Sequence, residues 1–163
     1  MRLLYFLLAI PFVFTSLCAQ PGNPIYFHKG GVEGVIFNVN YVHGFKKYAS
    51  ESISIDVNEV LRVDSLAYIY ILEMAPKNPH LIGGWEGCPR IPDSWNDYYR
   101  QVVSYRDIKT NDEIIYIHYV HKDEEKDFPN WSTKWVSISG GCSNFVTVIY
   151  NNTKKEIVQW GIN

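Results

Sequence analysis

The first nineteen residues, MRLLYFLLAIPFVFTSLCA, decide in which compartment the rest of the chain folds. They begin with a positive charge at Arg2, continue as an apolar run and end in small residues at Ala19, the pattern of a secretory signal peptide. Pro11 interrupts the apolar run, whereas a membrane-spanning helix needs about 20 continuous apolar residues. We therefore expect cleavage after Ala19 and export of residues 20–163, as one domain, to the periplasm or the extracellular space.

Cys18 lies at the end of this leader, where a cysteine can serve as a site of lipid attachment in exported bacterial proteins. Such sites place a small residue, Gly or Ala, directly before the cysteine, but here that position is taken by Leu17. We therefore expect simple cleavage before Gln20. Lipid anchoring through Cys18 is the alternative.

Export turns the two remaining cysteines into a structural constraint. Cys88 and Cys142 follow the leader, and two thiols in a small domain that folds in an oxidising compartment usually pair. The competing interpretation is a nucleophilic cysteine with a histidine as its base. An even number of cysteines in an exported chain favours the disulfide, which closes a loop of about 55 residues and stabilises the fold by about 4 kcal/mol.

Charge and motif content exclude several classes of function. Without the leader the chain has 14 Lys and Arg against 17 Asp and Glu, a net charge of −3. This balance gives no electrostatic basis for binding nucleic acid or anionic lipid. The sequence after the leader has no further apolar stretch that would span a bilayer, and no serine-nucleophile elbow, phosphate-binding loop or paired zinc ligands. We expect no cofactor and assign no catalytic residue.

Segments rich in Ile, Val, Tyr and Phe predict an antiparallel sheet or sandwich of about seven strands. Turn-forming residues at 29–31 and 151–155 indicate a hairpin near each end of the chain. The run at 66–73, LAYIYILE, is nearly all apolar and predicts a central strand covered on both faces. The expected strands are 25–28, 34–42, 66–73, 113–121, 134–139, 145–150 and 156–160.

One helix, packed across the sheet, is predicted near residues 94–108, which makes the fold class α+β. Ser94 and Asp97 match a capping box at its start. We expect a second, shorter helical turn to begin at Asp56, with a strand over 53–63 as the alternative. The residues that recur at helical spacing in the predicted helix are Trp95, Tyr98, Tyr99, Val102 and Val103.

The histidines and the acidic run do not predict a metal site. His118 and His121 lie three residues apart in an expected strand, so their side chains point to opposite faces. The acidic run at 123–127 lacks the ligand spacing and the central glycine of a calcium loop. We interpret it as a solvated hairpin tip.

The loop at 76–92 is the most distinctive segment, with four prolines and three glycines around Trp85. A disulfide at Cys88 would hold this loop rigid, and a rigid loop loses less entropy when it binds a partner. Trp beside Glu and Arg is a combination that is enriched at binding hot spots. The alternative is a structural crossover whose Trp fills the edge of the core. The candidate binding residues are His80, Trp85, Glu86 and Arg90, together with Trp131, which we expect to be exposed in the polar segment 128–132.

These patterns predict an exported, non-enzymatic binding protein, in its most concrete form an inhibitor or immunity-type protein that blocks another exported protein. Two alternatives come from other classes. One is a cell-envelope hydrolase with acidic residues such as Glu73 and Glu86. The other is a carbohydrate-binding module that uses Trp85 and Trp131. A carboxylate in a deep cleft beside a second titratable group would favour the enzyme, and coplanar exposed aromatic rings would favour the sugar.

Overall fold

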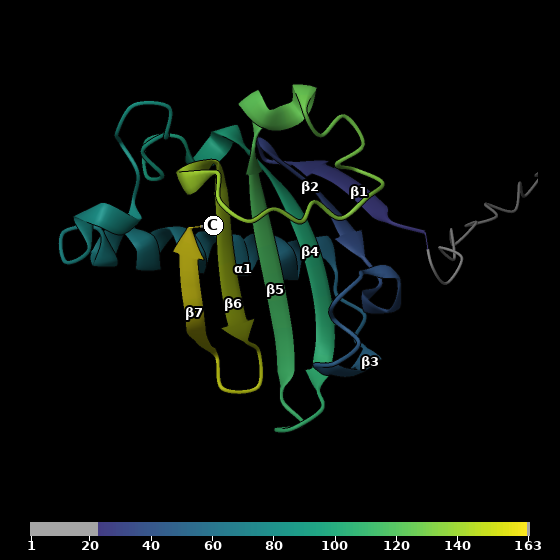
Figure 1. Ribbon diagram of the computed structural model, residues 1–163. Coiled ribbons are helices and arrows are strands. Elements are labelled where there is room, and N and C mark those ends of the chain that lie inside the picture. Colours follow the sequence, from purple (N-terminus) through teal and green to yellow (C-terminus); the bar gives the residue numbers. More distant parts are fainter. Residues whose placement is uncertain (1–22, 163) are drawn as a thin grey trace, which may run out of the picture.

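The computed structural model describes residues 23–162, so the expected leader at 1–19, its expected cleavage site and Cys18 lie outside the described residues. It contains a seven-stranded, mostly antiparallel sheet with one long helix across one face (Figure 1). The predicted α+β class is confirmed. The strands are β1 (Ile25–Lys29), β2 (Val32–Phe37), β3 (Ala49–Ser52), β4 (Tyr98–Asp107), β5 (Glu113–His121), β6 (Phe145–Asn151) and β7 (Glu156–Ile162), and the helix is α1 (Val57–Met74).

The strand order is β1-β2-β4-β5-β6-β7, and β3 pairs with β4 outside this path. The first half of β4 pairs in parallel with β2 and its last residues pair antiparallel with β3, so both strands share one edge of β4. The chain reaches β4 from β2 through β3 and α1, a crossover of the kind that parallel neighbours require. Both predicted hairpins are confirmed, as β1–β2 and β6–β7.

The helix does not lie where it was predicted. Residues 98–107 form β4 and not a helix, and the side chain of Ser94 makes no capping hydrogen bond. Neighbouring apolar residues of β4 point to opposite faces of the sheet. Tyr98 and Val102 lie in the core under α1, whereas Tyr99 and Val103 lie in the core on the opposite face. Because β4 is buried on both faces, its apolar residues come in pairs, and the buried polar residues Arg100 and Gln101 separate these pairs. The resulting recurrence of apolar residues four positions apart resembled a helical pattern.

The run at 66–73, predicted as a strand, is instead the second half of α1. Val63, Ala67 and Ile71 are fully buried at helical spacing against the sheet. Leu66, Ile69 and Leu72 lie exposed on the other side of the helix, which made the run look apolar on two faces. Within residues 23–162, no helix, α1 included, has the length and apolar character to cross a membrane.

The expected helix start at Asp56 is confirmed, but it opens the 18-residue helix α1 and not a short turn, and the alternative of a strand over 53–63 is wrong. The Asp56 carboxylate accepts the backbone N–H of Glu59 at 2.9 Å and so caps the first turn of α1. The expected strand at 34–42 is shorter than predicted, because β2 ends at Phe37. There the side chain of Asn38 accepts the N–H of Asn40 at 3.0 Å and starts a 3₁₀ turn, Val39–Tyr41.

A long connection between β5 and β6 crosses the face of the sheet opposite α1 (Figure 1). The strand expected at 134–139 is wrong: this segment is irregular and lies within that connection. The buried side chain of Gln101 holds it in place. Its amide nitrogen donates to the carbonyl oxygens of Trp131 at 2.6 Å and Lys134 at 2.7 Å, and its amide oxygen accepts the N–H of Val136 at 2.8 Å. One side chain thus forms hydrogen bonds with backbone groups of this connection that would otherwise need a neighbouring strand as partner.

A buried ion pair joins α1 to β4. Arg100 donates from Nε to Oδ1 of Asp64 at 2.9 Å, and the two side chains are 0% and 6% exposed. The indole N–H of Trp95 donates to the other carboxylate oxygen at 3.3 Å. The guanidinium of Arg100 also donates to the backbone carbonyls of Trp95, at 3.0 Å, and of Tyr98. These contacts tie the position of the helix to the start of the central strand.

Candidate functional site

The loop predicted as a binding site, residues 76–92, contains a closed segment, residues 82–91, which we name the clamped loop. Its two ends, Ile82 and Ile91, are buried and are joined by a backbone hydrogen bond of 2.8 Å. Two further backbone hydrogen bonds of 2.9 Å, from Gly84 to Cys88 and from Cys88 to Trp85, close a tight turn. Trp85 lies in this turn with 46% of its surface exposed, so its ring is presented to solvent and does not fill the core.

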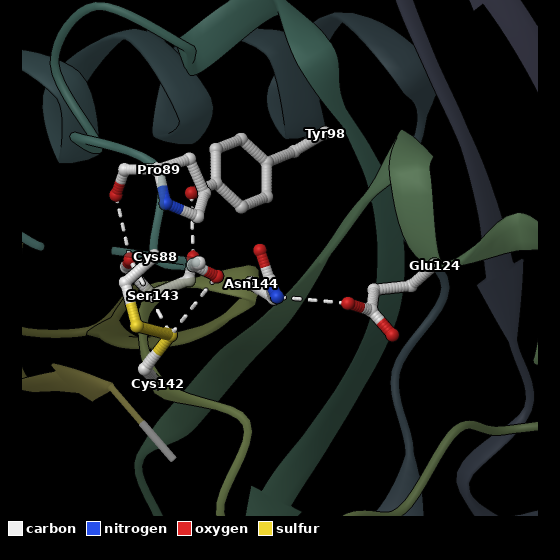
Figure 2. The surroundings of a disulfide bond; sticks show 8 residues. Cys88, Pro89, Tyr98, Glu124, Cys142, Ser143 and Asn144 are labelled. Atoms are coloured by element: carbon white, nitrogen blue, oxygen red, sulfur yellow. Dashed lines mark hydrogen bonds between the residues drawn. A yellow bond between two sulfur atoms is a disulfide. The ribbon is translucent and has the colours of Figure 1, made fainter. Parts of the chain in front are cut away.

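The disulfide Cys88–Cys142 holds the clamped loop from the side (Figure 2). The two Cα atoms are 6.0 Å apart, and the predicted pairing is confirmed. Ser143, next to the bridge, donates from its hydroxyl to the carbonyl of Pro89 at 2.5 Å, and its own carbonyl accepts the hydroxyl of Tyr98 at 2.6 Å. The loop is therefore bound to the segment before β6 and, through that segment, to the start of β4.

The segment that holds the clamped loop, Cys142–Asn144, is itself fixed to the turn that follows β5. The side-chain amide of Asn144 donates to the carboxylate of Glu124 at 2.8 Å, as Figure 2 shows. Glu124 belongs to a 3₁₀ turn, Lys122–Lys126, which directly follows β5. The acidic run interpreted as a solvated tip therefore has a structural use as well, because one of its carboxylates positions the partner of the clamped loop.

Close packing at Gly83 explains why the loop needs a glycine there. A Cβ at this position would lie 2.1 Å from the carbonyl oxygen of Pro89 and 2.3 Å from Oγ of Ser143, and φ is +73°. Gly87 has the same kind of backbone, with φ of +74°, but its Cβ would meet nothing within 4 Å. Substitutions at these two glycines therefore distinguish the effect of the backbone conformation on stability from the effect of close packing.

We expect Gly83→Ala to lower the free energy of unfolding by about 2–3 kcal/mol, because it adds a clash to an unfavourable φ. Gly87→Ala is the matched control and should cost about 1 kcal/mol, since only the backbone is strained. Chemical denaturation of both variants measures the difference. Equal losses of stability would show that the loop does not pack against Ser143 as described.

The other candidate residues of the loop region are exposed. His80 lies in a 3₁₀ turn, Pro79–Leu81, and Glu86 lies next to Trp85. Arg90 forms a surface ion pair with Asp93, with 2.7 Å between the charged atoms. Trp85, Glu86 and Arg90 thus belong to one rigid, solvent-facing segment.

The expectation that Trp131 is exposed is wrong. Its side chain is 5% exposed and stacks on the ring of Tyr99, with centroids 3.8 Å apart and planes 12° apart. The polar neighbours in 128–132 suggested a surface position, but Gln101 draws the backbone of Trp131 onto the sheet. Trp131 packs in the core on the face opposite α1, whereas Ile91 of the clamped loop packs in the core under α1. The structure therefore does not bring Trp131 and Trp85 together.

The two histidines of β5 lie on opposite faces, as their spacing predicts. His118 stacks on Phe145 at 6.0 Å between centroids, and His121 contacts the edge of Tyr98 at 5.1 Å. Burial lowers the pKa of His118 to about 4, so the ring is neutral at physiological pH. Among the residues that the structure describes, no three His, Cys, Asp or Glu side chains are grouped so as to hold a metal ion.

A second concave feature lies on the face opposite α1, and sequence reasoning missed it. We name it the open-face hollow; its volume is about 560 Å³, and the aromatic residues that line it are Phe45, Tyr48, Tyr105, Tyr116 and Trp135. The alternation along 113–121 places Tyr116 and His118 on one face of the strand, and this pattern could have indicated an aromatic surface there. The remaining walls come from residues 43–48, from the connection after β5 and from β4, β6 and β7, and no periodicity in the sequence links these segments to β5.

The chain was also compared with known proteins. No protein-family model matches it, and neither a curated protein nor a solved structure shows significant similarity to it.

Proposed function

We propose that this chain is an exported, non-enzymatic binding protein that presents the clamped loop to another exported protein. In its most concrete form it is an inhibitor or immunity-type protein that blocks its partner. The observation that carries the proposal is the exposed ring of Trp85 on a backbone that a disulfide and several hydrogen bonds hold in place. The disulfide is also compatible with folding in an oxidising compartment.

The physical argument concerns entropy and buried area. A flexible loop must be ordered when it binds, and this ordering weakens the affinity. The clamped loop is already ordered by its buried ends and by the contacts of Ser143 and the disulfide. An exposed Trp on such a loop offers a large apolar surface at little entropic cost, and Trp is among the residues that most often dominate binding energy. Glu86 and Arg90 supply charges at its rim.

Binding is preferred over the alternatives for two reasons. Glu73 and Glu86 are exposed, and neither forms an ion pair or a hydrogen bond with another titratable side chain in residues 23–162, so the hydrolase alternative gains no support. A sugar platform formed by Trp85 and Trp131 is not proposed, because the ring of Trp131 is buried and stacks on Tyr99.

Trp85→Ala tests the proposal, because it removes the exposed ring without disturbing the core. We expect it to change the free energy of unfolding by no more than about 0.5 kcal/mol and to weaken partner binding by about 30-fold or more. The mature chain is immobilised, exported proteins that it retains are identified, and the affinity of each purified candidate is then measured for the wild type and the variant.

Ile108→Ala is the control, since Ile108 is also a large exposed apolar residue, 58% exposed, but lies after β4 in the turn to β5. A genuine partner binds the wild type and Ile108→Ala equally and loses affinity for Trp85→Ala. The proposal fails if all three proteins retain the same partners with the same affinity, or if the folded wild type retains no exported protein.

A further inference from the structure

The open-face hollow is built from aromatic rings in mutually fixed orientations. Phe45 lies edge-on to Tyr105, Tyr116 and Trp135, with ring centroids 5.8, 4.9 and 5.4 Å away. The volume of the hollow, about 560 Å³, falls within the range of small-ligand sites. Tyr116 and Trp135 are only partly buried, so their rings keep surface that a ligand can cover. The hollow is therefore a shaped recess and not a flat part of the sheet.

Polar groups line this recess and have few protein partners. The hydroxyls of Tyr48 and Tyr105 form no hydrogen bond with any described residue, although the side chain of Tyr105 is largely buried. The hydroxyl oxygens of Tyr116 and Thr147 are 3.4 Å apart, which is long for a hydrogen bond. Burial, with a smaller effect of Asp107, raises the pKa of Tyr105 to about 12, so its hydroxyl keeps its proton and can donate. Gln159 and Ser137 add further donors and acceptors to the walls.

The charges at the rim are lysine ammonium groups. Lys47 lines the hollow, and Lys46 lines an adjoining recess that also includes Lys47. No Asp or Glu among the described residues lines either recess. Asp107, on the same face of β4 as Tyr105, is engaged by the backbone N–H groups of Lys109 and Thr110 at 2.9 and 2.8 Å. The hollow thus combines aromatic faces, unpaired hydroxyls and cations.

From these features we propose that the open-face hollow binds a saccharide that carries an anionic group. The apolar face of a sugar ring packs on the ring of Trp135, and the ring of Tyr116, tilted by 57° to it, borders the sugar from the side. The sugar hydroxyls exchange hydrogen bonds with the phenols of Tyr48 and Tyr105, and the anionic group lies against Lys47. The site uses no residue of the clamped loop and is therefore independent of the protein-binding function proposed above.

The experiment uses an array of oligosaccharides that carry uronic or sialic acid, with their neutral counterparts. The mature wild-type chain should retain acidic glycans, and calorimetric titration of the best of them should show at least tenfold tighter binding than the neutral counterpart. Raising the salt concentration should weaken this binding, because a charge pair contributes to it. Acetate and inorganic phosphate alone should bind at least 100-fold more weakly, since they lack the ring.

Three variants separate the site from the rest of the surface. Tyr105→Phe removes one hydroxyl and should weaken binding about three- to tenfold, the effect of one hydrogen bond. Lys47→Gln should weaken binding of the acidic glycan by a similar factor and leave the neutral one unchanged. Trp135→Ala should abolish binding of both. Lys77→Gln, an exposed lysine after α1, is the matched control for the loss of charge.

The proposal is overturned if the folded wild type retains no acidic glycan, or if neutral and acidic glycans bind equally. It is also overturned if Tyr105→Phe and Lys47→Gln bind as tightly as Lys77→Gln. Trp85→Ala should bind glycans as the wild type does. A loss of glycan binding in that variant would assign the sugar to the clamped loop and contradict the site described here.

Discussion

Asp64→Ala is expected to lower the free energy of unfolding by about 3–5 kcal/mol, because it leaves a buried guanidinium without its counter-ion. Arg100 is fully buried and donates to Asp64 from two of its nitrogens, at 2.9 and 3.4 Å. The Trp95 indole N–H would lose its acceptor as well. Urea denaturation of the wild type and the variant at pH 7 measures the change.

Two comparisons test this explanation. The double variant Asp64→Leu with Arg100→Met should be more stable than Asp64→Ala, because it removes both charges and fills their volume with apolar atoms. Asp93→Ala breaks the exposed pair with Arg90 and should cost less than about 1 kcal/mol. A cost below about 1 kcal/mol for Asp64→Ala would mean that the pair is not buried and does not hold α1 on the sheet.

Replacing both Cys88 and Cys142 by serine should lower the free energy of unfolding by about 4 kcal/mol, the chain-entropy value for a closed loop of about 55 residues. The bridge joins residues 54 positions apart, so the unfolded chain without it gains a large number of conformations. The variant should also bind its partner more weakly, because the clamped loop keeps only its hydrogen bonds to Ser143 and to its own backbone.

Reduction provides the control for this prediction. Dithiothreitol should destabilise the wild type by about as much as the double substitution does, and it should leave the serine variant unchanged. Denaturation curves of both proteins, with and without the reductant, make the comparison. A serine variant as stable as the wild type would show that the disulfide does not contribute to the fold, and mapping of the oxidised protein by mass spectrometry would then be needed to find free thiols at 88 and 142.

Local patterns predicted those elements whose signal lies within one short segment. The strand over 113–121 has the bounds that the structure gives to β5, and both hairpins follow from turn residues at 29–31 and 151–155. The cap at Asp56 was visible because a carboxylate and the N–H that it accepts lie three residues apart. The pairing of Cys88 with Cys142 followed from having two cysteines after the expected leader.

The exchange between helix and strand shows where local patterns fail. Residues 66–73 are almost continuously apolar, and such a run fits a buried strand or a buried helix equally well. Residues 98–107 instead repeat apolar pairs four positions apart, at 98–99 and 102–103, a spacing typical of a helix, because Arg100 and Gln101 between these pairs are buried too. The difference lies in their surroundings. Residues 98–107 have a neighbouring strand along each edge and apolar core on each face. Residues 66–73 lie against one face of the sheet and leave Leu66, Ile69 and Leu72 exposed.

By itself the sequence determined the α+β class, the two hairpins and the disulfide, because each of these depends on neighbouring residues or on the count of cysteines. Only the tertiary structure decided which apolar run is the helix, that Gln101 holds the connection after β5, and that Trp131 is buried while Trp85 is exposed. The tertiary structure also forms the open-face hollow, whose walls come from six separate segments. The physical reason is that burial and close approach depend on residues distant in the chain, which no local spacing records.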